Sequence, residues 1–189
     1  MPLLTEDTVF EKIDFTITPF QSGIYEGSTF KHCNFSQANL ADLVFRNCLF
    51  SDCDMSLVIL KNTALQDVTF AQCKLMGTQF SECRALLLQL KFKHCLLRMA
   101  AFYGLKLKNT VFDTCDLQEA DFADADLTAA VFKDCDLLMA TFEGTNLEKA
   151  DLRAAVNYAI NPLNNRIKKA KFSMPEAMHL LDYLGIDVS

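Results

Sequence analysis

The chain has 189 residues, of which 51% are hydrophobic, and its formal net charge is −6 at pH 7. This length fits one domain with a short tail. The apolar runs are too short for a transmembrane helix, which needs about 20 consecutive apolar residues. Residues 1–7 lack a basic segment followed by a long apolar one, so we expect no signal peptide, no membrane partner and a cytoplasmic location.

A large apolar residue occupies every fifth position from Phe10 to Leu152. The one interruption is a slip of two residues, after which the period resumes at Leu87. Phe172 is the one phenylalanine outside this period. A period of five fits neither the 3.6 residues of a helix nor the two of a strand. It indicates a repeat architecture.

The residue two positions before each large apolar residue is mostly small, and all eight cysteines lie there. They are Cys33, Cys48, Cys53, Cys73, Cys83, Cys95, Cys115 and Cys135. Each pentapeptide thus buries one large and one small side chain, as expected for a short extended segment that ends in a tight corner. Four such segments close a square coil of about 20 residues, and coils stack ~4.8 Å apart. Glycines two positions after the large residue suit these corners.

The cysteine spacings test this coil length inside the chain. Cys33, Cys53 and Cys73 are 20 residues apart, as are Cys95, Cys115 and Cys135, whereas the gap from Cys73 to Cys95 is 22. We therefore expect one cysteine column and a two-residue insertion between Cys83 and Leu87. We interpret these cysteines as small buried hydrophobes that replace alanine, without disulfides or a metal site. After the slip Phe and Leu alternate, which predicts Phe on two opposite sides of each coil.

Several repeats share a motif of alanine, then Asn or Asp, then a large apolar residue. They are Ala38-Asn39-Leu40, Ala120-Asp121-Phe122, Ala125-Asp126-Leu127 and Ala150-Asp151-Leu152. In this motif the chain resembles the pentapeptide-repeat family over roughly residues 8–154. The resemblance implies an all-β solenoid, a right-handed quadrilateral β-helix, here of about seven coils. We expect this domain to span 1–154, with the slip near 84–87, and a tail to span 155–189.

The tail predicts a short α-helix over about 174–184. Ser173 and Glu176 have the spacing of a capping box, and Gly185 suits the helix end. Met174, Ala177, Met178, Leu181 and Leu184 have helical spacing and form one apolar face. This face can cap the last coil or pair with a second copy. We expect pairing, with an interface formed by Met178, Leu181, Leu184 and Ile186.

Charge is unevenly spread along the chain. Residues 111–151 are strongly acidic, with Lys133 and Lys149 as the only bases. A basic belt without acids, residues 84–108, precedes them; it contains Arg84, Lys91, Lys93, Arg98, Lys106 and Lys108. A rod with regular surface carboxylates resembles a phosphate backbone and would attract a basic DNA-binding groove. The expected contact residues are Asp113, Asp116, Glu119, Asp121, Asp124, Asp126, Asp134 and Asp136. Alternatively, each aspartate is only a polar residue suited to its place in the repeat.

The end of the chain narrows the resemblance. Segments 155–162, 165–177 and 180–186 resemble the ending of the pentapeptide proteins that confer immunity to albicidin and microcin B17, and Leu184-Gly185-Ile186 is similar to the quinolone-resistance branch. The resemblance implies a homodimer joined through the tail. It also implies a DNA-mimicking protein that binds DNA gyrase or topoisomerase IV and protects it from a poison. The large projecting loops of the quinolone-resistance branch are not found here.

Other classes of function have less support in the sequence. No motif of a serine hydrolase, zinc protease, P-loop or dinucleotide site occurs, so we expect neither an enzyme nor a cofactor. Direct nucleic-acid binding through the basic belt ranks last, since the aromatic residues point inward and offer no stacking platform. The main alternative is a structural scaffold for protein–protein interaction without a topoisomerase role.

Overall fold

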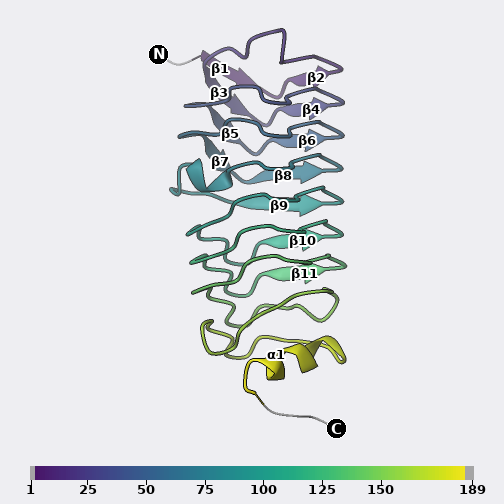
Figure 1. The fold of residues 1–189 in the computed structure, drawn as a ribbon. Coiled ribbons are helices and arrows are strands. Elements are labelled where there is room, and N and C mark those ends of the chain that lie inside the picture. Colours follow the sequence, from purple (N-terminus) through teal and green to yellow (C-terminus); the bar gives the residue numbers. More distant parts are fainter. Residues whose placement is uncertain (1–2, 186–189) are drawn as a thin grey trace.

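Two parallel sheets run along a single stack of coils in the computed structural model, which describes residues 3–185 (Figure 1). The four-stranded sheet contains β1 (Leu3–Glu6), β3 (Gly23–Glu26), β5 (Val44–Arg46) and β7 (Ala64–Gln66). The seven-stranded sheet contains β2 (Val9–Glu11), β4 (Thr29–Lys31), β6 (Leu49–Ser51), β8 (Val68–Ala71), β9 (Leu90–Lys93), β10 (Val111–Asp113) and β11 (Val131–Lys133). Each strand pairs with the strand one coil away.

The coil has four sides, which we number in chain order. Side one carries the four-stranded sheet, and side two carries the seven-stranded sheet. On sides three and four, isolated parallel bridges join successive coils. Examples are Leu96 with Asp116 on side three and Ala101 with Asp121 on side four. Partners are 20 residues apart in most coils, for example Phe30 with Phe50. These observations confirm the predicted β-solenoid of pentapeptide repeats.

The corners between sides explain the choice of residues two positions after each large apolar one. The backbone there has a positive φ, as at Asp42 (64°), Asn62 (55°) and Gly77 (65°). Only glycine adopts this left-handed conformation freely, while Asn and Asp tolerate it better than most other residues. The predicted corner glycines Gly27 and Gly144 also have positive φ, so their role is confirmed.

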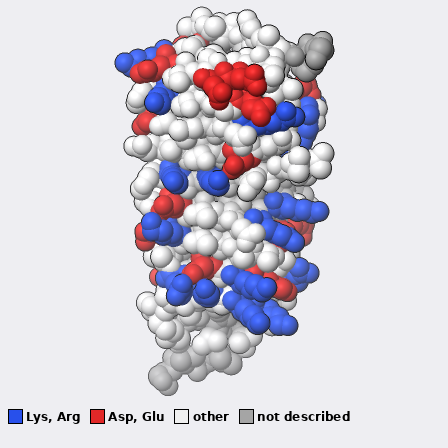
Figure 2. All heavy atoms as spheres, turned by 180° about the vertical axis from the view of Figure 1, so that it is seen from behind, with Lys and Arg blue, Asp and Glu red and all other residues white. Residues whose placement is uncertain are grey.

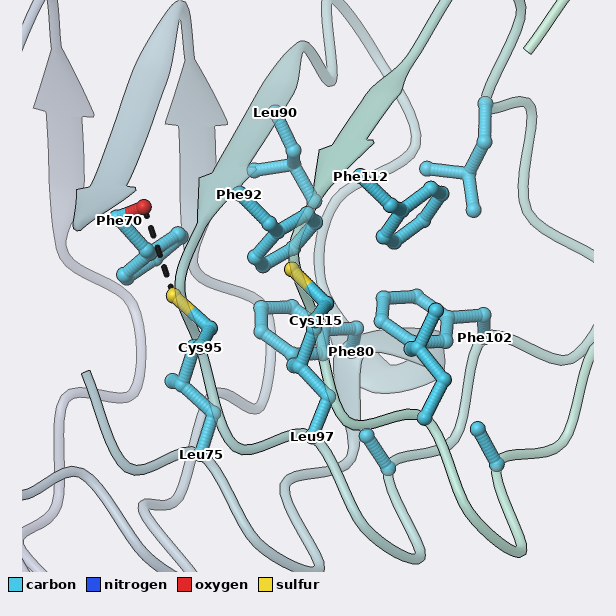
Figure 3. Close-up of a cluster of buried hydrophobic side chains, with 14 of the residues drawn as sticks. Phe70, Leu75, Phe80, Leu90, Phe92, Cys95, Leu97, Phe102, Phe112 and Cys115 are labelled. Atoms are coloured by element: carbon cyan, nitrogen blue, oxygen red, sulfur yellow. Dashed lines mark hydrogen bonds between the residues drawn. The ribbon is translucent and has the colours of Figure 1, made fainter. Parts of the chain in front are cut away.

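The core is built from stacked aromatic columns (Figure 3). On side two Phe92, Phe112 and Phe132 stack with ring centroids 5.2 and 5.0 Å apart. On side four Phe102 and Phe122 stack at 5.0 Å. The two columns meet edge to face across the core, with centroids 5.8 Å apart between Phe112 and Phe122. This is a favourable aromatic geometry, and it confirms that Phe lies on two opposite sides.

The cysteine column also lies where the spacing predicts. All eight thiols are buried and free. A stacked thiol donates a hydrogen bond to a carbonyl of the preceding coil, as Cys95 Sγ does to Phe70 O at 3.4 Å (Figure 3). Burial raises the pKa of the Cys83 thiol to about 12, which disfavours the reactive thiolate. The cysteines thus fill the core as small hydrophobes.

The two-residue slip is confirmed, but its inward residue is not the predicted Leu87. The register changes from 20 to 22 residues where Phe70 pairs with Phe92. Leu87 is 68% exposed in the connection that follows η1 (Phe80–Glu82), with a φ of 60°. Leu88 packs partly against the core in its place, and Leu90 is buried. The extra residues bulge outward from side one, which shifts the inward position by one before β9 restores the register.

The coils continue beyond residue 154. Asp151 forms a parallel bridge with Lys171, and Ile167 and Phe172 pack partly against the core. The tail ends in η2 (Glu176–Met178) and α1 (His179–Asp182), and Leu180 packs against the core, so the predicted short helix is present and covers the last coil. Over residues 3–185, no helix is long and apolar enough to cross a membrane.

The predicted capping box does not form. Ser173 Oγ instead donates a hydrogen bond to the carbonyl of Arg153 in the preceding coil, at 2.7 Å. The N-cap residues of η2 and α1, Pro175 and Met178, make no side-chain hydrogen bond to the helix. Ser173 is still part of the stacked coil, and this placement takes its hydroxyl away from the helix. Gly185 has a positive φ of 64°, but α1 ends earlier than predicted, at Asp182 with Tyr183 as its C-cap, so Gly185 lies beyond the helix end.

Candidate functional site

Half of the predicted contact acids have a structural task. An Asp directly before the large apolar residue accepts a hydrogen bond from the backbone N–H two residues later, which closes an Asx turn. The Asp121 carboxylate accepts from Ala123 N at 2.9 Å, and Asp116, Asp126 and Asp136 make the same contact. Asn146 does so without a charge, through its side-chain oxygen. The repeat thus explains an Asp or Asn at these positions, although not the choice of Asp.

Three of the predicted contact acids are paired with cations of a neighbouring coil. Asp113 lies 3.0 Å from Lys133 Nζ, Asp116 lies 2.6 Å from Arg98 Nε, and Asp126 lies 3.2 Å from Lys108 Nζ. The hydrogen bond from Lys133 lowers the pKa of Asp113. Burial raises the pKa of Asp126, but its hydrogen bonds with Thr128 and Lys108 outweigh this, and the net shift is downward. Exposed pairs of this kind add little stability, but they reduce the charge available to a partner.

The structure separates the eight predicted acids into two groups. Asp113 lies on side two, Asp126 on side one and Asp134 at the corner that ends side two, as their bridges and backbone angles place them. The other five lie on sides three and four and their corners, where Glu143 joins them. We call this set the acidic surface: Asp116, Glu119, Asp121, Asp124, Asp136 and Glu143. In its coils, Arg98 is the one base of the described residues on these two sides, and it is paired with Asp116.

Sides one and two carry more bases than acids, and the excess comes from residues 91–108 and 149–171, whereas Asp113, Asp126 and Asp134 lie between these two groups. Figure 2, seen from behind Figure 1, shows Lys and Arg side chains gathered over the lower part of the rod. We call this set the basic surface: Lys91, Lys93, Lys106, Lys108, Lys149, Arg153, Arg166, Lys168, Lys169 and Lys171. Counting charges along segments of sequence hides this separation, because each coil crosses both surfaces. Assigning every residue to a side by its place in the 20-residue period would have revealed it.

The predicted dimer residues lie on the C-terminal helix. Met178 and Leu181 are half-buried against their own chain, and Leu184 is exposed. Ile186 lies outside the described residues. The apolar face is therefore divided: Leu180 covers the last coil, while Leu184 and Tyr183 remain exposed to solvent.

Solved structures share the coil architecture. Two trypsin-treated variants of QnrB1, a plasmid-mediated fluoroquinolone resistance protein, match with TM-scores of 0.65 and 0.59. The first is 18% identical and covers 100% of this chain and 99% of that one; the second is 20% identical and covers 99% and 92%. HetL, a pentapeptide repeat protein involved in heterocyst differentiation regulation in the cyanobacterium Nostoc sp. strain PCC 7120, matches at 0.56. It is 15% identical and covers 90% and 85%.

At these identities the structural likeness shows the fold alone. The search of curated proteins finds no match. The family described as pentapeptide repeat region matches residues 24–86 and 84–152, which is more than half of the chain. Together with the four-sided coils and the buried five-residue period, this match shows that the chain belongs to the pentapeptide repeat family.

Proposed function

We propose that the protein binds DNA gyrase or topoisomerase IV through its acidic surface, in place of DNA, and protects the enzyme from a topoisomerase poison. The observation that carries the proposal is the gathering of carboxylates on sides three and four. Glu119 and Asp124 lie at successive corners of one coil, and Glu143 follows in the next. Coils repeat every ~4.8 Å, so carboxylates line the rod as phosphates line a duplex.

A rigid array of this kind fits a basic DNA-binding groove. The stacked coils fix the backbone that carries its carboxylates, so little backbone ordering accompanies binding. QnrB1, which shares the coil architecture, is a fluoroquinolone resistance protein, and fluoroquinolones are among the poisons to be tested. The basic surface on the opposite sides restricts the mimicry to one half of the rod's circumference.

A gyrase supercoiling assay tests this function. Purified protein is added at low micromolar concentration, with and without albicidin, microcin B17 or ciprofloxacin. We expect either inhibition of supercoiling by the protein alone or rescue of the poisoned enzyme, because the acidic surface competes for the DNA site. A folded protein without effect in any of these reactions contradicts the proposal and favours the scaffold function.

We also propose that two copies pair through the C-terminal helix. Replacing Leu181 by Asp should give monomers in sedimentation, since an unpaired carboxylate in an apolar interface is costly. Leu86→Asp is the matched control, because Leu86 is exposed in the slip region, far from the helix. Circular dichroism should show the same fold for both. If Leu181→Asp sediments as a dimer, the tail does not form the interface.

A scaffold function is the second candidate, and one observation favours it. Exposed apolar side chains gather on sides three and four and the corner between them, namely Leu57, Ile59, Met76, Leu96 and Met99. Leu57 and Met99 are both 57% exposed. Apolar groups clustered in this way on a rigid surface are typical of protein-binding sites. The group adjoins the acidic surface, because Leu96 is bridged to Asp116 in the next coil.

A further inference from the structure

We propose that the basic surface binds the phosphate backbone of duplex nucleic acid. The inference is independent of the proposed topoisomerase role, since it concerns the opposite sides of the rod. It departs from the sequence-based expectation of no direct nucleic-acid binding. That expectation considered only the belt at 84–108 and did not include the cations that residues 149–171 add to the same sides.

The cations near the C-terminal end are available to a ligand. Lys149 N donates to Lys168 O at 3.0 Å, so these two residues lie on adjacent coils. Among the ion pairs of the described residues, none involves Lys149, Arg166, Lys168 or Lys169. All four residues are exposed. The nearby Asp151 is already engaged by Arg153 at 2.7 Å and Lys171 at 3.8 Å, and its hydrogen bond with Arg153 lowers its pKa to about 2.

A second group of cations lines a groove beside the slip. The groove has a volume of about 290 Å³ and is lined by residues 88–93, which include β9, and by residues between 106 and 111; four of the lining residues are lysines. They are Lys91, Lys93, Lys106 and Lys108. Lys91 is paired with Asp67 and Lys108 with Asp126, so Lys93 and Lys106 supply the charge that is unpaired in the described part of the chain. The bulge of the two inserted residues interrupts the flat side of the rod here, which gives a hollow instead of a plane. A concave, cationic site of this kind concentrates positive potential toward an anion.

The spacing of the two groups suits a duplex. Lys106, Asp126, Asn146 and Arg166 are bridged in sequence, one residue per coil. Arg166 therefore lies three coils from Lys106 along the rod. At ~4.8 Å per coil the groups are about 14 Å apart along the rod. This is close to the ~12 Å width of the major groove, across which the two backbones of B-DNA face each other. One duplex can therefore place one backbone on each group.

The chemistry favours a duplex over a polycarboxylate and over a single strand. Most cations of the surface are lysines, which bind phosphates as compact point charges, whereas bidentate arginines match carboxylates and phosphates alike. Arg166 is the one arginine of the basic surface without an ion pair in the described structure. Arg153 is already bidentate to Asp151. Single strands need exposed aromatic rings on which bases stack. The exposed Tyr103 lies on side four, the exposed Tyr183 lies beside Leu138 of side three, and the described rings of the five-residue period point into the core.

Fluorescence anisotropy with a labelled duplex of about 20 base pairs tests this inference, since log affinity should fall linearly with log salt concentration. Replacing Lys149, Arg166, Lys168 and Lys169 by Gln should weaken binding at least tenfold. It should also reduce the salt slope by about 3–4 units, at 0.9 per phosphate contact. The control removes the same charge from the first coils: Lys12→Gln, Lys31→Gln, Lys61→Gln and Lys74→Gln. The control should bind as the wild type does.

Three results would overturn the inference. They are no duplex binding at about 50 mM salt, equal weakening by the two sets of substitutions, and polyglutamate or single-stranded DNA binding as tightly as the duplex. Thermal melting of both variants checks that the coils remain folded. This experiment can fail without contradicting the proposed action on gyrase, because the acids of sides three and four are intact in both variants.

Discussion

Replacement of Phe112 by alanine is expected to lower the free energy of unfolding by about 3–5 kcal/mol. Phe112 is fully buried and stacks on Phe92 and Phe132, with centroids 5.2 and 5.0 Å away. It also meets the edges of Phe102 and Phe122. Backbone hydrogen bonds hold the coils at a fixed spacing of ~4.8 Å, so the neighbouring rings cannot collapse into the space. Urea denaturation measures the change.

Val111→Ala is the matched control for this substitution. Val111 precedes Phe112 on the same strand, β10, but points outward and is 40% exposed. Its replacement should cost about 1 kcal/mol or less, as is usual for surface positions. If Phe112→Ala cost no more than Val111→Ala, the assignment of every fifth residue to the core would be contradicted.

Reversal of three charges on the acidic surface is expected to abolish the action on gyrase and leave the fold intact. The substitutions are Glu119→Lys, Asp124→Lys and Glu143→Lys. All three residues are exposed, and none closes an Asx turn in the described structure. Lysine already occupies left-handed corners of this rod at Lys149 and Lys169, so the backbone accepts it. Like charges facing each other in an interface cost several kcal/mol, which predicts an affinity reduced by about 100-fold or more.

The control for this reversal uses acids of the opposite sides. Asp52→Lys, Asp134→Lys and Glu148→Lys change the net charge by the same amount on side one and at the corner that ends side two. The proposed orientation predicts that this control still acts on gyrase in the supercoiling assay. Equal loss in both triple variants would show that net charge, and not the acidic surface, governs the effect.

Much of the fold could be predicted from the sequence because one period fixes it. The positions of Phe112 and Cys95 follow from counting in fives and twenties, and the corner glycines follow from backbone geometry. Leu87 could not be placed in this way, because an insertion breaks the period and local packing then decides which leucine turns inward. The hydroxyl of Ser173 found a partner in another coil, whereas the capping box considers only neighbours in sequence.

The candidate site was only partly accessible from the sequence. The acidic stretch at 111–151 is visible, but Asp113 and Asp126 point away from Glu119 and are paired with lysines of adjacent coils. The missing information is which side each residue occupies, and a charge count along the chain averages over all four sides. The turn-closing role of Asp121 was also invisible, since it depends on the corner conformation.

The most direct test of the central claim is the equilibrium binding of three proteins to gyrase: the wild type and the two triple variants. A binding measurement reports the contact with gyrase directly, without a poison in the reaction. The account predicts that duplex DNA displaces the wild type, that the variant carrying Asp52→Lys, Asp134→Lys and Glu148→Lys binds equally well, and that the variant carrying Glu119→Lys, Asp124→Lys and Glu143→Lys does not bind. Undiminished binding of this last variant would contradict the claim that the acidic surface occupies the DNA site.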